Sequence, residues 1–429
     1  MDARGNERRL KAHRAQRPGR RRAGLLLVLL LTLSVAGTGL WILLRSPPSR
    51  SLTLTLVPLP FDDIRGWRAT DARAALAAFQ RSCSVILRLE PARPMGGAGY
   101  AGRAADWRNV CEAARRPGHG ADGARKWFEA WFSPFAARSG SDKEALFTGY
   151  FEPEIQVSRE QHGSYTVPIF GLPEDLVTAE LGDFRSDLAG TRIAGRVENR
   201  RLVSFPSRSE IEKHGLSDAP ILLYANNPVS LFFMQIQGSG RGQLEDGTML
   251  RLAYAGQNGR TYTPIGRTLV RRGALDREHV SMHAIKAWLE AHPGAASQIM
   301  ESDDSYVFFR ELPIGDSHLG SPGTEGVPLT PEASIAIDPG VHALGVPMFV
   351  DVAGSVDNPD RLPTALGRLC IAQDTGGAIK GNLRADIFWG FGARAEAIAG
   401  GMKSSGLLYV LLPKTLVASL PPRFSGTRP

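Results

Sequence analysis

The stretch Gln373–Gly390, QDTGGAIKGNLRADIFWG, holds two carboxylates, a lysine and four glycines. The apolar run Leu369–Ala372 ends just before Asp374, and another, Ile387–Trp389, begins just after Asp386. Runs of this length predict short strands, so both carboxylates are expected at strand ends. The glycines between them permit sharp turns and close approach of the backbone. We predict a site of chemistry here; a hairpin whose aspartates cap turns is the alternative.

The chain length of 429 residues predicts two or three domains, or one large domain with an insertion. Residues 1–50 contain eleven Lys or Arg against Asp2 and Glu7, a net charge of +9, while the whole chain carries +8. The remainder is therefore nearly neutral, at about −1. This distribution removes the main support for nucleic-acid binding, which the overall charge would otherwise favour.

The N-terminus has the pattern of a membrane anchor. A basic tail at residues 1–22 is followed by an uncharged apolar run at residues 23–44. As a helix, this run could cross the roughly 30 Å hydrocarbon core of a bilayer. It is also longer than the apolar segment of a typical cleaved signal peptide. We predict an uncleaved transmembrane signal anchor with a linker at residues 45–60. The positive-inside rule places the tail in the cytoplasm and the remaining chain in the periplasm, so the predicted location is the cell envelope with an inner-membrane anchor.

Hydrophobic periodicity divides the rest of the chain into three parts. Residues 61–145 show helical spacing, and residues 146–265 show short β-like runs such as Leu231–Ile236. Residues 266–415 mix strands with a helix from Asp276 and a short Ala-rich helix near Ala393–Met402. The helix from Asp276 is expected to end at Ala291 before Pro293. Residues 416–429 are predicted to form a tail.

Three cysteines are present. In an exported protein, Cys83 and Cys111 could form a disulfide that closes a loop of about 29 residues, with buried free thiols as the alternative. Cys370 lies in an apolar strand pattern and is expected to be a small core residue.

Neither a metal nor a cofactor is predicted. His279 and His283 have the four-residue spacing of a zinc helix, but Val280 stands where that motif needs a glutamate. Gly238, Ser239 and Gly240 lack the context of a nucleophile elbow or of a dinucleotide-binding loop.

A set of neutral polar and aromatic residues suits a sugar chain, since amides and hydroxyls match sugar hydroxyls and aromatic rings stack on sugar faces. The alternative for each residue is a structural hydrogen bond. Glycosidases normally use two carboxyl groups, but one suffices if a substrate hydroxyl is the nucleophile. The set comprises Tyr150, Gln235, Gln237, Ser239, Tyr254, Gln257, Asn258 and Tyr262.

Six motifs in order resemble those of the membrane-bound lytic murein transglycosylases of the A type. The last motif is similar to that of the 3D domain, named for three aspartates, here Asp338, Asp374 and Asp386. The six are FTGYF at 147–151, PIFGLP at 168–173, FFMQIQGSG at 232–240, YAGQNG at 254–259 followed by YTPIG at 262–266, SYVFFRE at 305–311, and residues 373–390.

The resemblance implies a mainly β fold with flanking helices: a double-psi β-barrel, a second β-barrel inserted into it, and a glycan groove between them. It implies a cofactor-free peptidoglycan lytic exotransglycosylase that cleaves the β-1,4 bond between N-acetylmuramic acid and N-acetylglucosamine and leaves 1,6-anhydro ends. Matching the motifs assigns the catalytic acid/base to Asp386 and a supporting carboxylate to Asp374. Substrate binding is assigned to Tyr150, Gln235, Gln237, Gly238, Ser239, Tyr254, Asn258 and Lys380.

Two other functions compete with this one. A non-catalytic peptidoglycan-binding scaffold would keep the groove without turnover, and a hydrolytic muramidase would leave hydrated ends. The best-known family members are outer-membrane lipoproteins, whereas no cysteine lies near the apolar run here. The expected partners are glycan strands and, through the N-terminal helix, the membrane.

Overall fold

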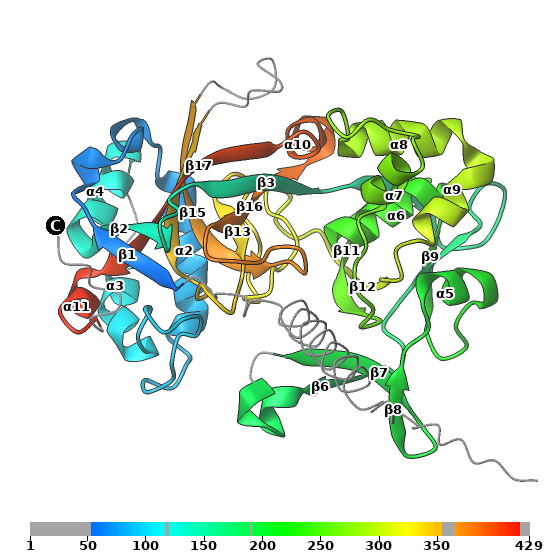
Figure 1. The fold of residues 1–429 in the computed structure, drawn as a ribbon, viewed down its shortest axis with the longest axis horizontal. Coiled ribbons are helices and arrows are strands. Elements are labelled where there is room, and N and C mark those ends of the chain that lie inside the picture. Colours follow the sequence, from blue (N-terminus) through cyan, green and yellow to red (C-terminus); the bar gives the residue numbers. More distant parts are fainter. Residues whose placement is uncertain (1–52, 116–119, 189–190, 354–364, 421–429) are drawn as a thin grey trace, which may run out of the picture. The chain divides into compact units, whose positions relative to one another are not determined.

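The computed structural model describes residues 53–115, 120–188, 191–353 and 365–420 (Figure 1). Residues 1–52, which contain the predicted tail, the anchor and most of the linker, lie outside these ranges. None of the helices in the described ranges is long and apolar enough to cross a membrane. The signal anchor therefore stays a prediction.

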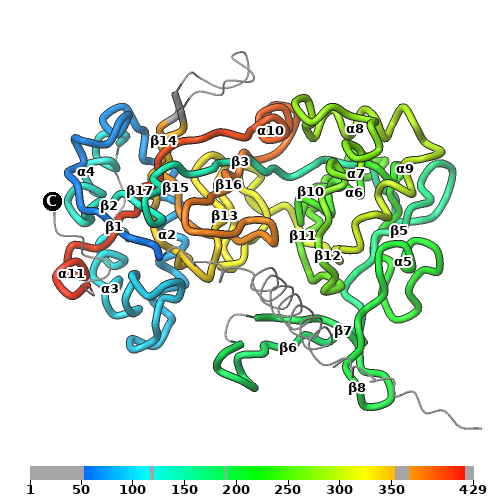
Figure 2. Tube along the Cα trace, viewed as in Figure 1, coloured from blue at the N-terminus to red at the C-terminus, as the bar shows by residue number. Residues whose placement is uncertain are grey.

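Six strands form a closed barrel. Their order is β17, β14, β15, β13, β16, β3, and β3 pairs back with β17, which closes the sheet. Figure 2 shows β3, from the first half of the chain, beside β16 and β17 from its end. The strands are β3 (Ala145–Glu152), β13 (Ser334–Ile337), β14 (Pro347–Ala353), β15 (Ala365–Thr375), β16 (Arg384–Phe391) and β17 (Lys403–Pro413).

Two N-terminal strands and several helices complete this part of the molecule. β1 (Leu54–Pro58) pairs with β2 (Phe132–Ser139), which pairs with β17. Buried aromatic rings pack the first helices together, with the Phe79 centroid 5.8 Å from that of Trp127. The helices are η1 (Phe61–Asp63), η2 (Trp67–Ala69), α2 (Arg73–Ile86), α3 (Ala104–Ala114), α4 (Ala121–Trp131), α10 (Gly392–Ala399) and α11 (Lys414–Val417).

A disulfide joins Cys83 of α2 to Cys111 of α3, across 28 positions of sequence, and Cys370 is a buried free thiol. Because this cross-link removes conformations from the unfolded chain, replacing both cysteines with alanine is expected to lower the free energy of unfolding by about 3 kcal/mol. Urea unfolding of the double variant measures this cost. An unchanged unfolding midpoint would show that the bond contributes nothing to stability.

The insert lies between β3 and β13 and contains a six-stranded sheet in the order β12, β11, β10, β4, β9, β5. A separate three-stranded sheet is formed by β6, β7 and β8. The strands are β4 (Glu154–Ser158), β5 (Val167–Phe170), β6 (Val177–Glu180), β7 (Arg192–Glu198), β8 (Arg201–Ser204), β9 (Ile221–Ala225), β10 (Gly240–Gln243), β11 (Met249–Gln257) and β12 (Val307–Leu312). The helices are η3 (Leu181–Asp183), η4 (Ser186–Leu188), α5 (Arg208–His214), α6 (Pro228–Gln237), α7 (Ile265–Arg271), α8 (Met282–Ala291) and α9 (Pro293–Met300).

The predicted strand Leu231–Ile236 is wrong, because these residues belong to helix α6. The Asn227 side chain accepts a hydrogen bond from the Ser230 amide at 3.0 Å, and Pro228 occupies the first turn. Gly238 ends the helix with φ of 83°. Since α6 is buried on nearly all sides, its apolar residues show no helical stripe that would distinguish them from a buried strand.

The helix predicted from Asp276 to Ala291 is shorter than expected. It begins at Met282, where the Ser281 hydroxyl accepts a hydrogen bond from the Ala284 amide. Pro293 follows its end, as predicted, and also opens the next helix, α9. Proline suits a first helical turn because its missing N–H would have no partner there.

The strand pairings and core contacts near residues 146 and 265, the predicted limits of the inserted domain, show which core each neighbouring element joins. Strand β3, placed in the insert by the limit at residue 146, pairs with β16 and β17 of the barrel. At the other limit, residue 265, helices α7 to α9 pack on α6 through residues such as Leu269 and Ile299, and β12 pairs with β11. These helices and strand β12 pack with elements of the insert, so we propose that the insert extends through Leu312.

Candidate active site

Strand β13 lies between β15 and β16 and holds Asp374 and Asp386 apart. Ala336 of β13 is in register with Asp374 on one side and with Asp386 on the other. The two backbones are thus separated by two inter-strand spacings, roughly 10 Å. β15 and β16 are not paired with each other, so the alternative of a simple hairpin with capping aspartates is wrong.

Asp386 is half-buried and hydrogen-bonded by a neighbouring strand. The Thr148 hydroxyl of β3 donates to Asp386 Oδ1 at 2.5 Å and accepts from Arg384 Nη2 at 2.8 Å. Burial raises the pKa of Asp386 to about 6, and the negative charge of Asp374 adds to this; the Thr148 hydrogen bond and the Arg384 charge act in the opposite direction. This carboxyl group can therefore gain and lose a proton near neutral pH.

Asp374 is held by donors from three segments. Its Oδ2 accepts from the Tyr150 hydroxyl at 3.0 Å, while Oδ1 accepts from the Thr324 amide and hydroxyl at 3.0 Å and from the Thr375 amide at 2.9 Å. Burial raises the pKa of Asp374, although these hydrogen bonds favour its ionised form. Burial also raises the pKa of Tyr150 well above its ordinary value, so the phenol remains a donor. The result is a fixed carboxylate with one orientation.

A cavity of about 310 Å³ is lined by both aspartates and by residues of the insert. The loop after β15, residues 376–379, forms part of its wall. Tyr254 lies at this cavity with 45% of its surface exposed. The residues predicted to bind sugar that line it are Tyr150, Gln235, Gln237, Gly238, Tyr254, Gln257 and Tyr262.

Three residues assigned to substrate binding do not line this cavity. The buried Asn258 amide donates to the carbonyl oxygens of Pro206 and Asp304, which fixes loops of the insert. The Ser239 hydroxyl donates to Glu152 at 3.4 Å. The Lys380 ammonium group lies 3.8 Å from Asp338 on a side chain that is 64% exposed.

Asp338 serves the backbone rather than the cavity. Its carboxylate accepts hydrogen bonds from the Gly381 amide at 2.8 Å and from the Gly340 amide at 3.1 Å. These bonds tie the end of β13 to the loop that precedes β16. Of the three aspartates, only Asp374 and Asp386 reach the cavity.

Several residues at the site were not singled out from the sequence. Thr148 donates a hydrogen bond to Asp386, and Arg384 donates one to Thr148. Both residues could have been predicted from their positions in the sequence. Thr148 is two residues before Tyr150, and Arg384 is two residues before Asp386, so each shares a strand face with a predicted residue. Nothing in the sequence indicated Thr324 or Arg208, because they lie in a loop and a helix far along the chain from both aspartates.

No cluster of three or more His, Cys, Asp or Glu side chains suited to a metal ion occurs in the described part of the chain. His279, which has zinc-helix spacing with His283, lies 3.7 Å from Asp276 in an exposed pair. The side chains around the two aspartates are instead hydroxyl, phenol, amide and guanidinium groups.

Comparison with known proteins agrees with this architecture. Residues 146–310 match the MltA specific insert domain, and residues 333–412 match the 3D domain. Membrane-bound lytic murein transglycosylase A of Escherichia coli K12 is 34% identical over 290 residues, which cover 66% of this chain and 69% of the relative.

Solved structures are similar along most of the chain. The membrane-bound lytic murein transglycosylase of Agrobacterium tumefaciens superimposes with a TM-score of 0.74 at 31% identity, covering 85% of this chain and 99% of that one. MltA of E. coli with bound chitohexaose gives a TM-score of 0.61 at 27% identity, covering 85% and 95%. The barrel, the insert and the sequence identity together show that this chain belongs to the membrane-bound lytic murein transglycosylase A family.

Proposed function

We propose that this protein is a lytic transglycosylase. It cleaves the β-1,4 bond between N-acetylmuramic acid and N-acetylglucosamine without water and leaves 1,6-anhydro-N-acetylmuramoyl ends. The observation that carries the proposal is the half-buried Asp386, with a pKa of about 6, in a cavity lined by amides and tyrosines. The activity named for the relatives and the chitohexaose bound by E. coli MltA support the same substrate class.

In the proposed mechanism Asp386 acts twice. Its protonated carboxyl group gives a proton to the glycosidic oxygen as the bond from that oxygen to C1 of the muramic acid breaks. The 6-hydroxyl of the same muramic acid then attacks C1, and its proton passes to the Asp386 carboxylate. One C–O bond breaks and another forms, so the acid is regenerated and no second protein nucleophile is needed.

Asp374 is proposed to support this chemistry by its charge. Positive charge develops at C1 in the transition state of glycoside cleavage, and a fixed carboxylate nearby stabilises it. Four hydrogen bonds hold the Asp374 carboxylate in place before the substrate arrives. Tyr254 is proposed to stack on a sugar ring, and the Gln237 side chain to bind an N-acetyl group or hydroxyl.

Digestion of purified peptidoglycan by the full-length protein, followed by mass analysis of the released muropeptides, tests the proposal. Anhydro ends are lighter than reducing ends by one water, so they are recognised directly. Release of hydrated reducing ends would instead identify a muramidase. Binding of glycan without any release would identify a scaffold.

The pH dependence of turnover is a separate prediction. Because Asp386 must begin protonated, turnover is expected to fall as the pH rises above about 6. Asp374→Asn removes the negative charge that raises the Asp386 pKa, so the falling limb is expected to move to lower pH. Initial rates of muropeptide release between roughly pH 4 and pH 9 measure the falling limb in the wild type and in Asp374→Asn. A falling limb at the same pH in the two proteins would show that Asp374 does not affect the acid.

The same group affects stability in a defined direction. The Asp386 pKa rises from 3.8 to about 6 on folding, so its contribution to stability is complete below about pH 4 and is lost as the pH rises through 6. In Asp386→Asn, which does not titrate, this loss is absent. The melting temperature of the wild type, relative to that of Asp386→Asn, should therefore fall between about pH 4 and pH 6 and stay constant at higher pH.

The finer architecture and location remain part of this proposal. We infer a double-psi connection in the barrel, a second barrel in the insert, and an inner-membrane anchor at residues 23–44. The apolar run and the preceding cations support the anchor. It would keep the cavity in the periplasm, next to its proposed substrate.

A further inference from the structure

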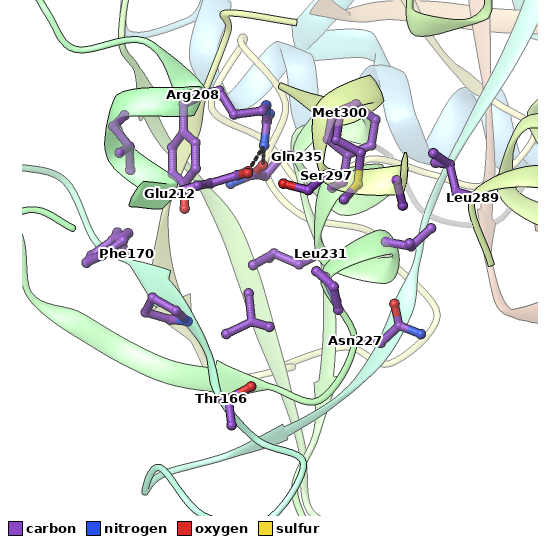
Figure 3. A pocket seen from close by; sticks show the side chains of 18 of the residues that line it. Thr166, Phe170, Arg208, Glu212, Asn227, Leu231, Gln235, Leu289, Ser297 and Met300 are labelled. Carbon is purple, nitrogen blue, oxygen red and sulfur yellow. Dashed lines mark hydrogen bonds and ion pairs between the residues drawn. The ribbon is translucent and has the colours of Figure 1, made fainter. Parts of the chain in front are cut away.

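A second cavity, of about 650 Å³, lies inside the insert between β5 and helices α5, α6, α8 and α9. Its size is within the range of about 300 to 1,000 Å³ that is typical of small-molecule sites. Figure 3 shows Phe170, Leu231 and Met300 around it, with Arg208, Glu212 and Gln235 together on one side. The cavity is therefore a largely apolar space in which Arg208 and Glu212 form one charged wall.

Arg208 forms the centre of that wall and is only 2% exposed. Its guanidinium donates to Glu212 Oε1 at 3.0 Å, to Gln235 Oε1 at 2.5 Å, and to the carbonyl oxygens of Asp303 and Ser305. The ring of Phe232 also lies 4.6 Å from the guanidinium carbon. Since four of its five N–H groups are engaged, Arg208 has little capacity left to bind an anionic ligand.

Glu212 provides the group that a ligand could use. Arg208 occupies its Oε1 atom, while Oε2 has no hydrogen-bond partner among the described residues, and the side chain is 33% exposed. The charged residues lining the cavity are Arg208, Glu212 and Glu290, a formal net charge of −1. Burial raises the pKa of Glu212, so a positive group beside its carboxylate would offset the loss of water.

We propose that this cavity binds an apolar molecule that carries a primary amine, with the ammonium group on Glu212 and the apolar part among Phe170, Leu231 and Met300. An ammonium group has three donors and would satisfy the unused carboxylate oxygen. The apolar part would be removed from water against side chains that are already in place.

The cavity shares a wall with the candidate active site. Arg208 and Gln235 line both spaces, and Asp303 and Ser305, whose carbonyls Arg208 holds, line the active-site cavity. A cation on Glu212 Oε2 shares that carboxylate with Arg208, which donates to Oε1, and so weakens the hold of Glu212 on Arg208. Occupancy of this amine site therefore alters glycan binding across one layer of side chains, a consequence that rests on the proposed function.

Calorimetry with the full-length protein in lipid nanodiscs tests the amine site. The probes are 4-phenylbutylamine, 4-phenylbutanol and 4-phenylbutyrate, which share an apolar part and differ in the head group. 4-Phenylbutylamine is expected to bind at least about tenfold more tightly than 4-phenylbutyrate, because the anionic head group cannot donate a charged hydrogen bond to Glu212. Glu212→Gln should remove this preference, whereas the exposed control Glu278→Gln should keep it.

Filling the cavity gives a second criterion. Ala296→Phe adds a ring at a lining position and is expected to abolish binding of all three probes. If this variant does not fold, Ser297→Phe, at an exposed lining position, replaces it. Equal affinity for the amine and the anion, or binding that survives the filled cavity, would refute the site.

Coupling to the active site is measured as the affinity for chitohexaose. Saturating 4-phenylbutylamine is expected to change this affinity by about fivefold or more, and Glu212→Gln to remove the change. An unchanged affinity refutes the coupling. Absence of any chitohexaose binding would contradict both the proposed function and the coupling. Calorimetry with the three probes tests the amine site independently of that result.

Discussion

Asp386→Asn is expected to lower the rate of muropeptide release by about 100- to 10,000-fold, the usual contribution of a general acid/base. Asparagine keeps the shape of the side chain and can still contact the Thr148 hydroxyl, but it neither gives nor takes the proton that bond cleavage requires. The rate with purified peptidoglycan measures the loss. The affinity for chitohexaose, measured separately, should remain close to that of the wild type.

A matched control is available on the same barrel. Asp142 is exposed in the turn between β2 and β3, so Asp142→Asn makes the same chemical change away from the cavity and should keep full activity. Asp142→Asn should unfold at a temperature near that of the wild type. Asp386→Asn should unfold at neutral pH at a temperature no lower than that of the wild type, because it lacks the carboxyl group whose ionisation costs stability there. Near-normal turnover by Asp386→Asn would assign the acid/base to another residue.

Arg241→Met is expected to lower the free energy of unfolding by about 3–5 kcal/mol, because it leaves the buried Glu152 carboxylate without its positively charged partner. Arg241 Nε lies 3.3 Å from Glu152 Oε2, and both side chains are buried where β3 of the barrel leads into the insert. The guanidinium also lies 3.3 Å from the centre of the Phe391 ring. Urea unfolding measures the cost.

An exposed ion pair gives the comparison. In the pair of Arg68 with Asp62 the side chains are 76% and 69% exposed, so Arg68→Met should cost less than about 1 kcal/mol. Adding Glu152→Gln to Arg241→Met removes the unpaired charge and should recover part of the stability. Equal costs for Arg241→Met and Arg68→Met would show that the buried pair has no special role.

The positions of the two aspartates could be predicted from the sequence, and their spatial relation could not. Apolar runs beside Asp374 and Asp386 indicated strand ends, and the structure has both residues in β15 and β16. The strand between them, β13, is more than thirty residues earlier in the chain. No local pattern indicates which strand pairs with which when the partners are far apart in sequence.

The same distinction explains the other outcomes. Tyr150 and Gln237 reach the cavity because their strand and helix end there, whereas Asn258 has an equally suitable side chain that loop carbonyls occupy. Arg208 could not be predicted as a wall of two cavities, since both its hydrogen bonds and its burial depend on residues about 27 to 97 positions away. Residue type indicates what a side chain can bind, and tertiary packing decides what it does bind.

The closure of the barrel has a consequence for how the protein folds. The Thr148–Asp386 hydrogen bond joins residues 238 positions apart, and β3 finds its partners only in β16 and β17. Contacts of such long range slow folding, because the chain loses much entropy before they form. The insert has its own sheet and core, so we expect it to become structured first and to shorten the effective loop between β3 and β13. Mutations in the insert core should therefore slow formation of the active site without contacting it.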